Sequence, residues 1–422
     1  MTLRSRVRRL LGTLGVSKDD LWKLLWRARR TIGAATPSGG SSVHVYLDEP
    51  RDTITSSSVH LKGWVAARNS IDLVVEVNDR RLPLHFYERP DVTRAFEGHW
   101  AQGFSTFVRL SELEDRASLS VRFSSAGRTL FERRFGVHQD AQSAAAAEND
   151  VRARHRAWLT GRMVCIRCAA PLDANMRCTG CGHEYVVDGL LNCLPDGMAA
   201  ATEIEFTGAV CSHGYDGDVE RVLRGVEAQG GMALDCGAGW RHVLRPSVIT
   251  TEIFPYPSTD VVAVSQRLPF ADGVFDAVLS LHVLEHVSNP FVCAAELLRV
   301  LKPGGTLFAV TPMIAPEHGF PHHYFNPTRE GLSQLFGRHA ADARVFVPHL
   351  GHPINGVHSV LGVYAETLPA AVKERFLNLT VRDILAKSIE DWLPEEIATA
   401  MSDEGRARLA ANFCIELTRK PN

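Results

Sequence analysis

The stretch MALDCGAGW, residues 232–240, decides the fold of the C-terminal half of this chain. Three apolar residues lead into Asp235, and a turn with Gly237 and Gly239 follows, as at the end of a buried strand. Such a turn lets the backbone approach a nucleotide-like ligand, because no Cβ stands in the way. Glu252 follows at a second strand end, where its carboxylate can accept the hydroxyls of a ribose. The spacing predicts a nucleotide-type cofactor, but dinucleotide sites look alike.

Residues 261–311 predict alternating strands and helices. Residues 275–281 form a buried strand, and the apolar positions of residues 291–301 repeat at helical spacing until a proline and two glycines end the helix. A further strand is expected at residues 306–311. Strand–helix–strand units build a parallel sheet that binds ligands at the carboxyl ends of its strands. We therefore expect a Rossmann-like α/β domain whose sheet is parallel except for an antiparallel last strand.

Four motifs within this stretch resemble those of class I methyltransferases. They are LPF (268–270), GVFD (273–276), VLEHV (283–287) and RVLKPGG (299–305). The resemblance extends from about residue 205 to the end of the chain. It implies S-adenosylmethionine as the cofactor, with Leu268 beside the adenine. The residues that it assigns to cofactor binding are Asp235, Gly237, Gly239, Glu252 and Leu268.

One position departs from the resemblance. Methyltransferases of this class usually carry an Asp before the LPF motif that accepts the adenine amino group, and Val264 holds that place. Ser265, Gln266 or a backbone carbonyl is expected to substitute. Because a site without a substitute would bind the cofactor weakly, a scaffold that kept the fold and lost the chemistry stays open as an alternative.

Two CxxC pairs predict a structural zinc site. CIRC at residues 165–168 and CTGC at residues 178–181 stand nine residues apart, so two tight turns can bring four sulfurs to one tetrahedral centre. Zinc would replace the hydrophobic core that about 30 residues cannot build. The expected ligands are Cys165, Cys168, Cys178 and Cys181. With GHEYVVDGL at residues 182–190, this segment resembles the zinc ribbon related to the activator subunit of tRNA and protein methyltransferases.

The chain before the cysteines predicts an all-β sandwich. Short alternating runs, broken by turn residues, predict strands at residues 59–65, 71–77, 104–110, 119–123 and 129–135. The segments around Gly63-Trp64-Val65 and Gly103-Phe104 resemble small β-sandwich modules appended to bacterial enzymes that act on glycans. Trp64 and Phe104 are then either core aromatics or a platform that stacks on sugars.

These patterns divide the chain into five parts. They are a basic amphipathic helix with a linker (1–42), the β-sandwich (43–138), a linker helix (139–162), the zinc ribbon (163–197) and the methyltransferase domain (198–422). Within the last part we expect a strand at residues 343–347, a helical insert from about residue 368 to 411, and the last strand at residues 413–417.

The composition of the chain indicates its expected cellular compartment and its expected partners. A net charge of -2 gives the 422-residue chain no overall attraction to nucleic acid, which is not expected as a partner. No apolar run approaches the roughly 20 residues that cross a bilayer. Nine cysteines, four of them in CxxC pairs, suit a reducing compartment. The expected location is cytoplasmic, with the alternative of peripheral contact between residues 1–30 and the inner face of the membrane. The oligomeric state is left open.

Histidines near the expected cofactor site are candidate general bases. His282 follows the strand of residues 275–281, and His318, His322 and His323 lie in the loop EHGFPHHYFNPT, residues 317–328. The loop histidines and Glu317 are an alternative metal site, and His286 is expected to be structural. Because methyl transfer depends mainly on alignment, the acceptor stays open. The leading interpretation is that the acceptor is a glycan, glycolipid or other small molecule methylated at oxygen or nitrogen. The alternative is that the acceptor is RNA or protein.

Overall fold

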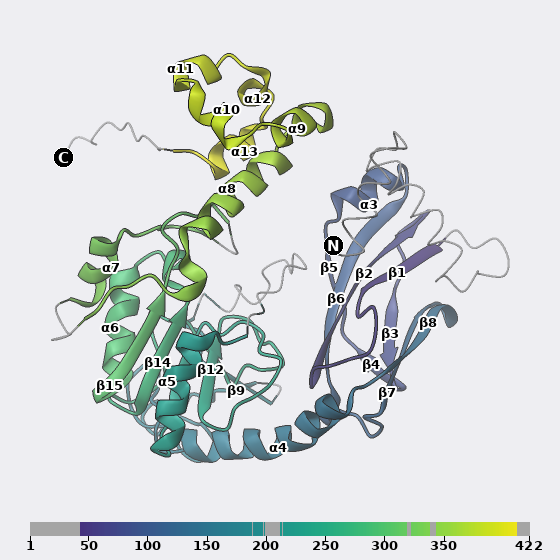
Figure 1. The fold of residues 1–422 in the computed structure, drawn as a ribbon. Helices are drawn as coiled ribbons and strands as arrows, with labels where there is room; N and C mark the ends of the chain where they lie inside the picture. The colour runs from purple at the N-terminus through teal and green to yellow at the C-terminus, as the bar shows by residue number, and fades with distance from the viewer. Residues whose placement is uncertain are drawn as a thin grey trace, which may run out of the picture. The chain divides into compact units, whose positions relative to one another are not determined.

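The computed structural model describes residues 43–187, 189–196, 198, 212, 214–318, 322–337 and 343–411. The chain folds as two compact units (Figure 1). Of the described residues, the first contains Val43–Ile54, His60–Thr106 and Ala117–Val137. The second contains Thr55–Val59, Phe107–Arg116 and the described residues from His138 onward. The expected basic helix and linker of residues 1–42 lie outside the described residues.

The first unit is built on two four-stranded sheets. One has the order β1 (Val43–Glu49), β2 (Ser58–Ala67), β6 (Trp100–Arg109) and β5 (His85–Tyr87), and the other has the order β4 (Arg80–Leu82), β3 (Val74–Val77), β7 (Ser118–Ser125) and β8 (Arg128–Gly136). The short helix α3 (Pro90–Ala95) precedes β6. Strand β7 pairs antiparallel with both β3 and β8, and β8 follows it in the chain after a short turn.

Aromatic residues from the two sheets meet in the core of the first unit. Phe104 and Phe123 are fully buried, and their ring centroids lie 4.7 Å apart. Phe104 is therefore a core aromatic. Trp64 is only partly buried and stacks on the ring of Tyr46, at 5.6 Å between centroids. The sugar-stacking interpretation thus stays open for Trp64 alone.

The second unit is built on a seven-stranded sheet. Its order is β15 (Leu301–Val310), β14 (Phe275–Leu281), β11 (Ala233–Cys236), β12 (Val248–Glu252), β13 (Val261–Val262), β10 (Leu190–Asn192) and β9 (Val186–Val187). Neighbouring strands from β15 to β10 are parallel, and β9 pairs antiparallel with β10. Strand β14 has the bounds that the sequence predicts.

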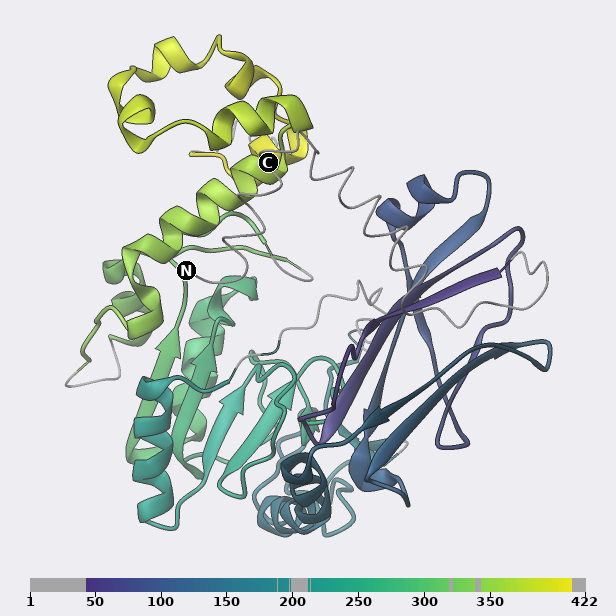
Figure 2. The ribbon, with the colours of Figure 1, turned by 45° about the vertical axis from the view of Figure 1, so that its right-hand side comes forward.

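Helices α5 (Gly217–Ala228) and α6 (Pro290–Val300) cover opposite faces of this sheet (Figure 2). Leu223 of α5 packs in one apolar cluster with Ala277 and Leu279, while Leu297 of α6 packs in another with Val278. Successive residues of β14 point to opposite faces of the sheet, so the strand needs apolar residues on both faces; Asp276 and Ser280 are its polar positions. Each fully buried Leu contributes about 1.5–3 kcal/mol to stability.

The edges of the sheet differ from the prediction. Residues 413–417, expected as the antiparallel last strand, lie outside the described residues. The antiparallel strand that the structure describes is β9, from the cysteine-bearing segment. Because β10 pairs parallel with β13, that segment shares the sheet of the following domain. The strand predicted at residues 343–347 is wrong, because these residues are irregular and Val347 is 69% exposed. Their apolar residues are consecutive and lack the alternation of a half-buried strand.

Helices make up most of the chain after β15. They are α7 (Arg329–Phe336), the 3-10 turn η4 (His349–Gly351), α8 (Pro353–Glu366), α9 (Ala370–Leu377), α10 (Val381–Ala386), α11 (Ile389–Trp392), α12 (Glu396–Thr399) and α13 (Asp403–Arg408). Helices α9 to α13 gather beyond the end of α8 around Leu368, Val372, Ile397 and Met401 (Figure 2). None of the helices in the described part of the chain has the length and apolar character to cross a membrane.

The helix α4 (Gln139–Leu159) is held to the sheet by a buried histidine. His155 is almost fully buried; its Nδ1 lies 3.0 Å from Asp260 Oδ1 and its Nε2 lies 3.0 Å from the Arg245 carbonyl. The second oxygen of Asp260 accepts from the backbone N–H of Thr250 at 3.0 Å, within β12. The imidazole therefore links three segments of the second unit.

His155→Leu is expected to destabilise the second unit by about 2–3 kcal/mol, because a buried carboxylate oxygen and a buried carbonyl lose their partner. Urea unfolding followed by circular dichroism measures the change. His349→Ala is the control, since His349 is exposed and should cost less than about 0.5 kcal/mol. Equal midpoints for the two variants would contradict a structural role for His155.

Candidate functional site

The order of the strands reverses between β11 and β14, which is the point where an open α/β sheet has its crevice. From β11 the chain adds β12 and β13 on one side, and it then returns to add β14 and β15 on the other. In open α/β sheets, ligands bind at such a point, outside the carboxyl ends of the strands. The glycine turn follows β11 and His282 follows β14, so the predicted cofactor turn and one predicted base lie at this crevice.

The glycine turn is packed tightly against the loop after β14. Gly237 and Gly239 have φ values of +73° and +62°, in the region that favours glycine. The N–H groups of Gly237 and Ala238 both donate to the Thr251 carbonyl of β12, at 2.9 and 3.0 Å. A Cβ on Gly237 would lie 2.4 Å from Cγ2 of Val283. Only a glycine therefore lets these two segments approach so closely.

Glu252 closes the turn from the end of β12. Its Oε2 accepts from the Gly239 N–H at 2.8 Å, and its Oε1 accepts from its neighbour Ile253 N–H at 2.7 Å. Burial raises the pKa of this carboxyl, against the opposing effect of the two N–H donors. Each carboxylate oxygen can accept a further hydrogen bond, so Glu252 both orders the turn and offers acceptors to a ligand.

Asp235 has a different environment, which the sequence did not predict. Its Oδ2 accepts from the Tyr215 hydroxyl at 2.7 Å and from Arg241 Nε at 3.0 Å, and the residue is 0% exposed. Burial, with the nearby Asp235 charge, raises the pKa of Tyr215 well above its usual value. The other oxygen, Oδ1, is buried and has no hydrogen-bond partner among the described residues. Asp235 therefore anchors the turn through Tyr215 and Arg241.

The residues predicted beside the adenine lie on the β13 side of the sheet. Leu268 is buried in the cluster under α6, and its N–H donates to Glu296 Oε2 at 2.8 Å. Val264 is also buried. Next to it, the Ser265 hydroxyl lies 3.3 Å from Gln266 Oε1, so polar atoms do stand near the position where the usual Asp is missing.

The predicted histidines fall into two groups. His282 has φ +59°, an uncommon conformation outside glycine, and its Nδ1 lies 3.5 Å from Glu285 Oε1. The rings of His318 and His323 meet edge to face at 4.4 Å between centroids, and the ring centroid of His286 lies 5.2 Å from that of His318. The ring of His323 is satisfied at both nitrogens, by the His318 N–H and by the Asn326 side chain.

The side chains of two further residues of this loop, His322 and Glu317, are not part of the described group that could share a metal ion. The carbonyl of His322 accepts from the His286 ring at 2.6 Å. The backbone N–H of Glu317 donates to the Arg408 carbonyl, and its carboxylate is not among the side chains that could share a metal ion in the described part of the chain. The acidic residue that the structure places beside the histidines is Glu285, which the sequence analysis did not select.

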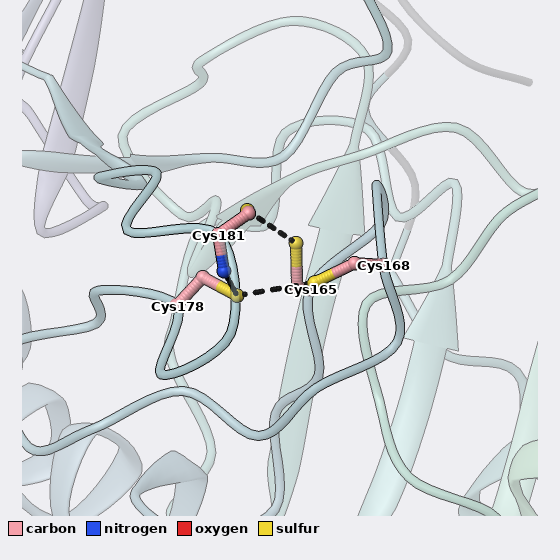
Figure 3. A group of neighbouring side chains, drawn as sticks. All are labelled: Cys165, Cys168, Cys178 and Cys181. Atoms are coloured by element: carbon pink, nitrogen blue, oxygen red, sulfur yellow. Dashed lines mark hydrogen bonds between the residues drawn. The ribbon is translucent and has the colours of Figure 1, made fainter.

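The four cysteines of the CxxC pairs converge (Figure 3). Their sulfurs all lie within 4.8 Å of one another, with Cys165 and Cys181 at 3.7 Å and Cys168 and Cys178 at 3.4 Å. Tyr185 lies beneath them, and its hydroxyl is 3.0 Å from the Cys165 sulfur. Gly180 and Cys181 direct backbone N–H groups at the Cys178 sulfur at 3.3 Å, a pattern that stabilises thiolates.

The mostly parallel sheet and the glycine turn beside Glu252 define a Rossmann-like α/β domain. Comparisons with known proteins agree: residues 244–309 match the family model described as a methyltransferase domain. Over 98 residues the chain is 39% identical to an uncharacterized methyltransferase of Mycobacterium marinum, which covers 23% of this chain and 35% of that protein. The same values hold for an uncharacterized methyltransferase of Mycobacterium tuberculosis.

The chain spans about a third of the length of these curated relatives, 35% of each. Among solved structures, a SAM-dependent methyltransferase of Thermotoga maritima is 18% identical, with a TM-score of 0.22, over 31% of this chain and 79% of that one.

Proposed function

We propose that this protein transfers the methyl group of S-adenosylmethionine to oxygen or nitrogen of a glycan, glycolipid or other small acceptor. The observation that carries the proposal is the glycine turn, which packs on Val283 and donates the Gly239 N–H to Glu252 at the switch point of the sheet. When bound, the cofactor supplies an electrophilic methyl group. The protein then has to bind it, align the acceptor and remove a proton.

The residues of the crevice fit this cofactor. Gly237 and Gly239 leave the backbone free of Cβ atoms where the ligand must pass, and the Glu252 carboxylate offers acceptors for two ribose hydroxyls. The Ser265 hydroxyl and Gln266 amide are the candidates for the adenine amino group in place of the missing Asp. Asp235, which is enclosed by Tyr215 and Arg241, supports the turn from below.

His282 is the proposed general base for a hydroxyl acceptor. It stands directly after β14, beside Val283 and therefore beside the glycine turn. A non-glycine residue in the left-handed region costs about 1–2 kcal/mol, and such residues cluster at functional sites. The contact of its Nδ1 with Glu285 orients the ring.

Calorimetric titration with S-adenosylmethionine and S-adenosylhomocysteine tests the proposal. We expect micromolar binding by the full chain and a loss of roughly 10- to 100-fold in Glu252→Gln, because hydrogen bonds to a charged acceptor contribute about 1.5–3 kcal/mol. Glu366→Gln, at an exposed position on α8, should bind normally. No binding by the unaltered protein would favour the scaffold alternative, to which the buried Val264 points.

The four cysteines are proposed to hold one structural Zn²⁺. Four sulfurs within 4.8 Å of one another match the tetrahedral thiolate set that zinc prefers, and such a closed set leaves no position for substrate. The apolar cluster beneath them includes Met163 and Tyr185 and continues into the sheet. Zinc would thereby stabilise the edge of the methyltransferase domain.

A further inference from the structure

Three side chains beside the crevice form a second cluster of metal-ligand type. Glu285 and His286 belong to the 3-10 turn η3 (Leu284–His286) after β14, and His318 belongs to the loop after β15. One potential ligand atom from each lies within 4.8 Å of the others. The two loops are also joined directly, since the N–H of Tyr324 donates to the Glu285 carbonyl at 2.7 Å.

The Glu285 carboxylate lacks the partners that a buried charge needs. The residue is 0% exposed, and neither carboxylate oxygen has a hydrogen-bond partner among the described residues. His282 Nδ1 lies 3.5 Å from Oε1, and the His282 side chain is itself half exposed. A buried and uncompensated carboxylate is costly, so a cation bound at these oxygens would remove the cost.

The carbonyl contacts of the two histidines point to Nε2 as the nitrogen that would bind a metal. His286 Nδ1 lies 2.6 Å from the His322 carbonyl, and His318 Nδ1 lies 2.8 Å from the Pro316 carbonyl. A carbonyl only accepts, so each Nδ1 must carry the proton, and each Nε2 keeps a lone pair. Metal-binding histidines are typically oriented in this way by a backbone carbonyl. His323, with both nitrogens engaged, is excluded as a ligand.

We infer that Glu285, His286 and His318 bind one divalent transition-metal ion, such as Zn²⁺. Two imidazoles and one carboxylate suit zinc, iron, cobalt or manganese, whereas magnesium and calcium prefer sets made of oxygen alone. Three protein ligands leave coordination positions open. On the proposed function, an open position takes an oxygen of the acceptor, next to His282 and the glycine turn. The acceptor would then be a molecule whose reacting hydroxyl can bind metal.

Cobalt titration of the full chain loaded with one equivalent of zinc, which the four cysteines should hold, tests the second site without requiring activity. We expect about one Co²⁺ per chain to bind with the visible absorption of a nitrogen and oxygen site, and without the thiolate charge-transfer bands of a cysteine site. Glu285→Gln and His318→Ala should each weaken binding at least about 100-fold, at or above the effect usual for outer-shell partners. His323→Ala is the matched control, because its ring is adjacent but already satisfied.

Each contrary result overturns the inference. Cobalt that binds only with thiolate bands, or that binds Glu285→Gln and His318→Ala as well as the unaltered protein, removes the metal site. A rise in thermal stability of Glu285→Gln without any metal effect would instead mean that Glu285 is a buried group that serves no ligand. Because cofactor titration is a separate measurement, failure of the metal site and failure of the proposed methyltransferase function remain distinguishable.

Discussion

Loss of zinc from the cysteine cluster is expected to unfold the segment of residues 163–192 and to lower the thermal midpoint of the second unit by more than about 10 °C. The metal-binding energy of a four-ligand zinc site is folding energy, with apparent values of about 10–16 kcal/mol in zinc-finger peptides. Here the same apolar cluster contains Met163 and Tyr185 from this segment and Val261 from β13. The damage should therefore spread to the sheet, where β10 pairs with β13.

Cys178→Ser, measured by zinc content and by calorimetric melting, makes the test specific. Cys178 receives two backbone N–H contacts, so its thiolate should be a ligand that the protein cannot easily replace. Cys193→Ala is the control: this thiol is buried nearby but stands outside the cluster, and its loss should leave the zinc content unchanged. A Cys178→Ser variant that keeps both its zinc and its melting temperature would rule out the structural zinc site.

The elements that could be predicted from local sequence are those that are buried on both faces, because burial sets the pattern of their apolar residues. Strand β14 is mostly apolar because α5 packs on one face and α6 on the other, so its bounds were predictable. The cysteine pairs were equally clear, since two short turns bring ligands that are close in sequence into contact. Gly237 and Glu252 could be selected because both stand at strand ends.

The residues that sequence analysis missed depend on contacts between distant segments. Glu285 lies within the VLEHV stretch, and only the approach of the loop with His318 makes it a candidate ligand. Tyr215 likewise meets Asp235 across twenty residues of chain. The strand predicted at residues 343–347 was wrong because an apolar run does not show whether a sheet edge is available to pair with it.

Gly237→Ala is expected to abolish measurable binding of S-adenosylmethionine, with a loss of at least about 100-fold, or about 3 kcal/mol. The substitution adds strain of about 1 kcal/mol at φ +73°. It also places a Cβ 2.4 Å from Cγ2 of Val283, so the turn or the loop after β14 must move. Calorimetric titration measures the loss, and circular dichroism checks that the variant is folded.

Two further variants separate the effect of the steric clash with Val283 from the effect of the positive φ. Gly230→Ala has a similar φ of +62° but no atom within 4 Å of the added Cβ, so it should lose stability and keep its affinity. Adding Val283→Ala to Gly237→Ala leaves 3.4 Å to the nearest atom of residue 283 and should recover most of the binding. If the double variant binds no better than Gly237→Ala, the contact with Val283 does not shape the cofactor site. Recovery would show that the loop bearing His282 and Glu285 is positioned by the glycine turn, which couples cofactor binding to the acceptor side of the crevice.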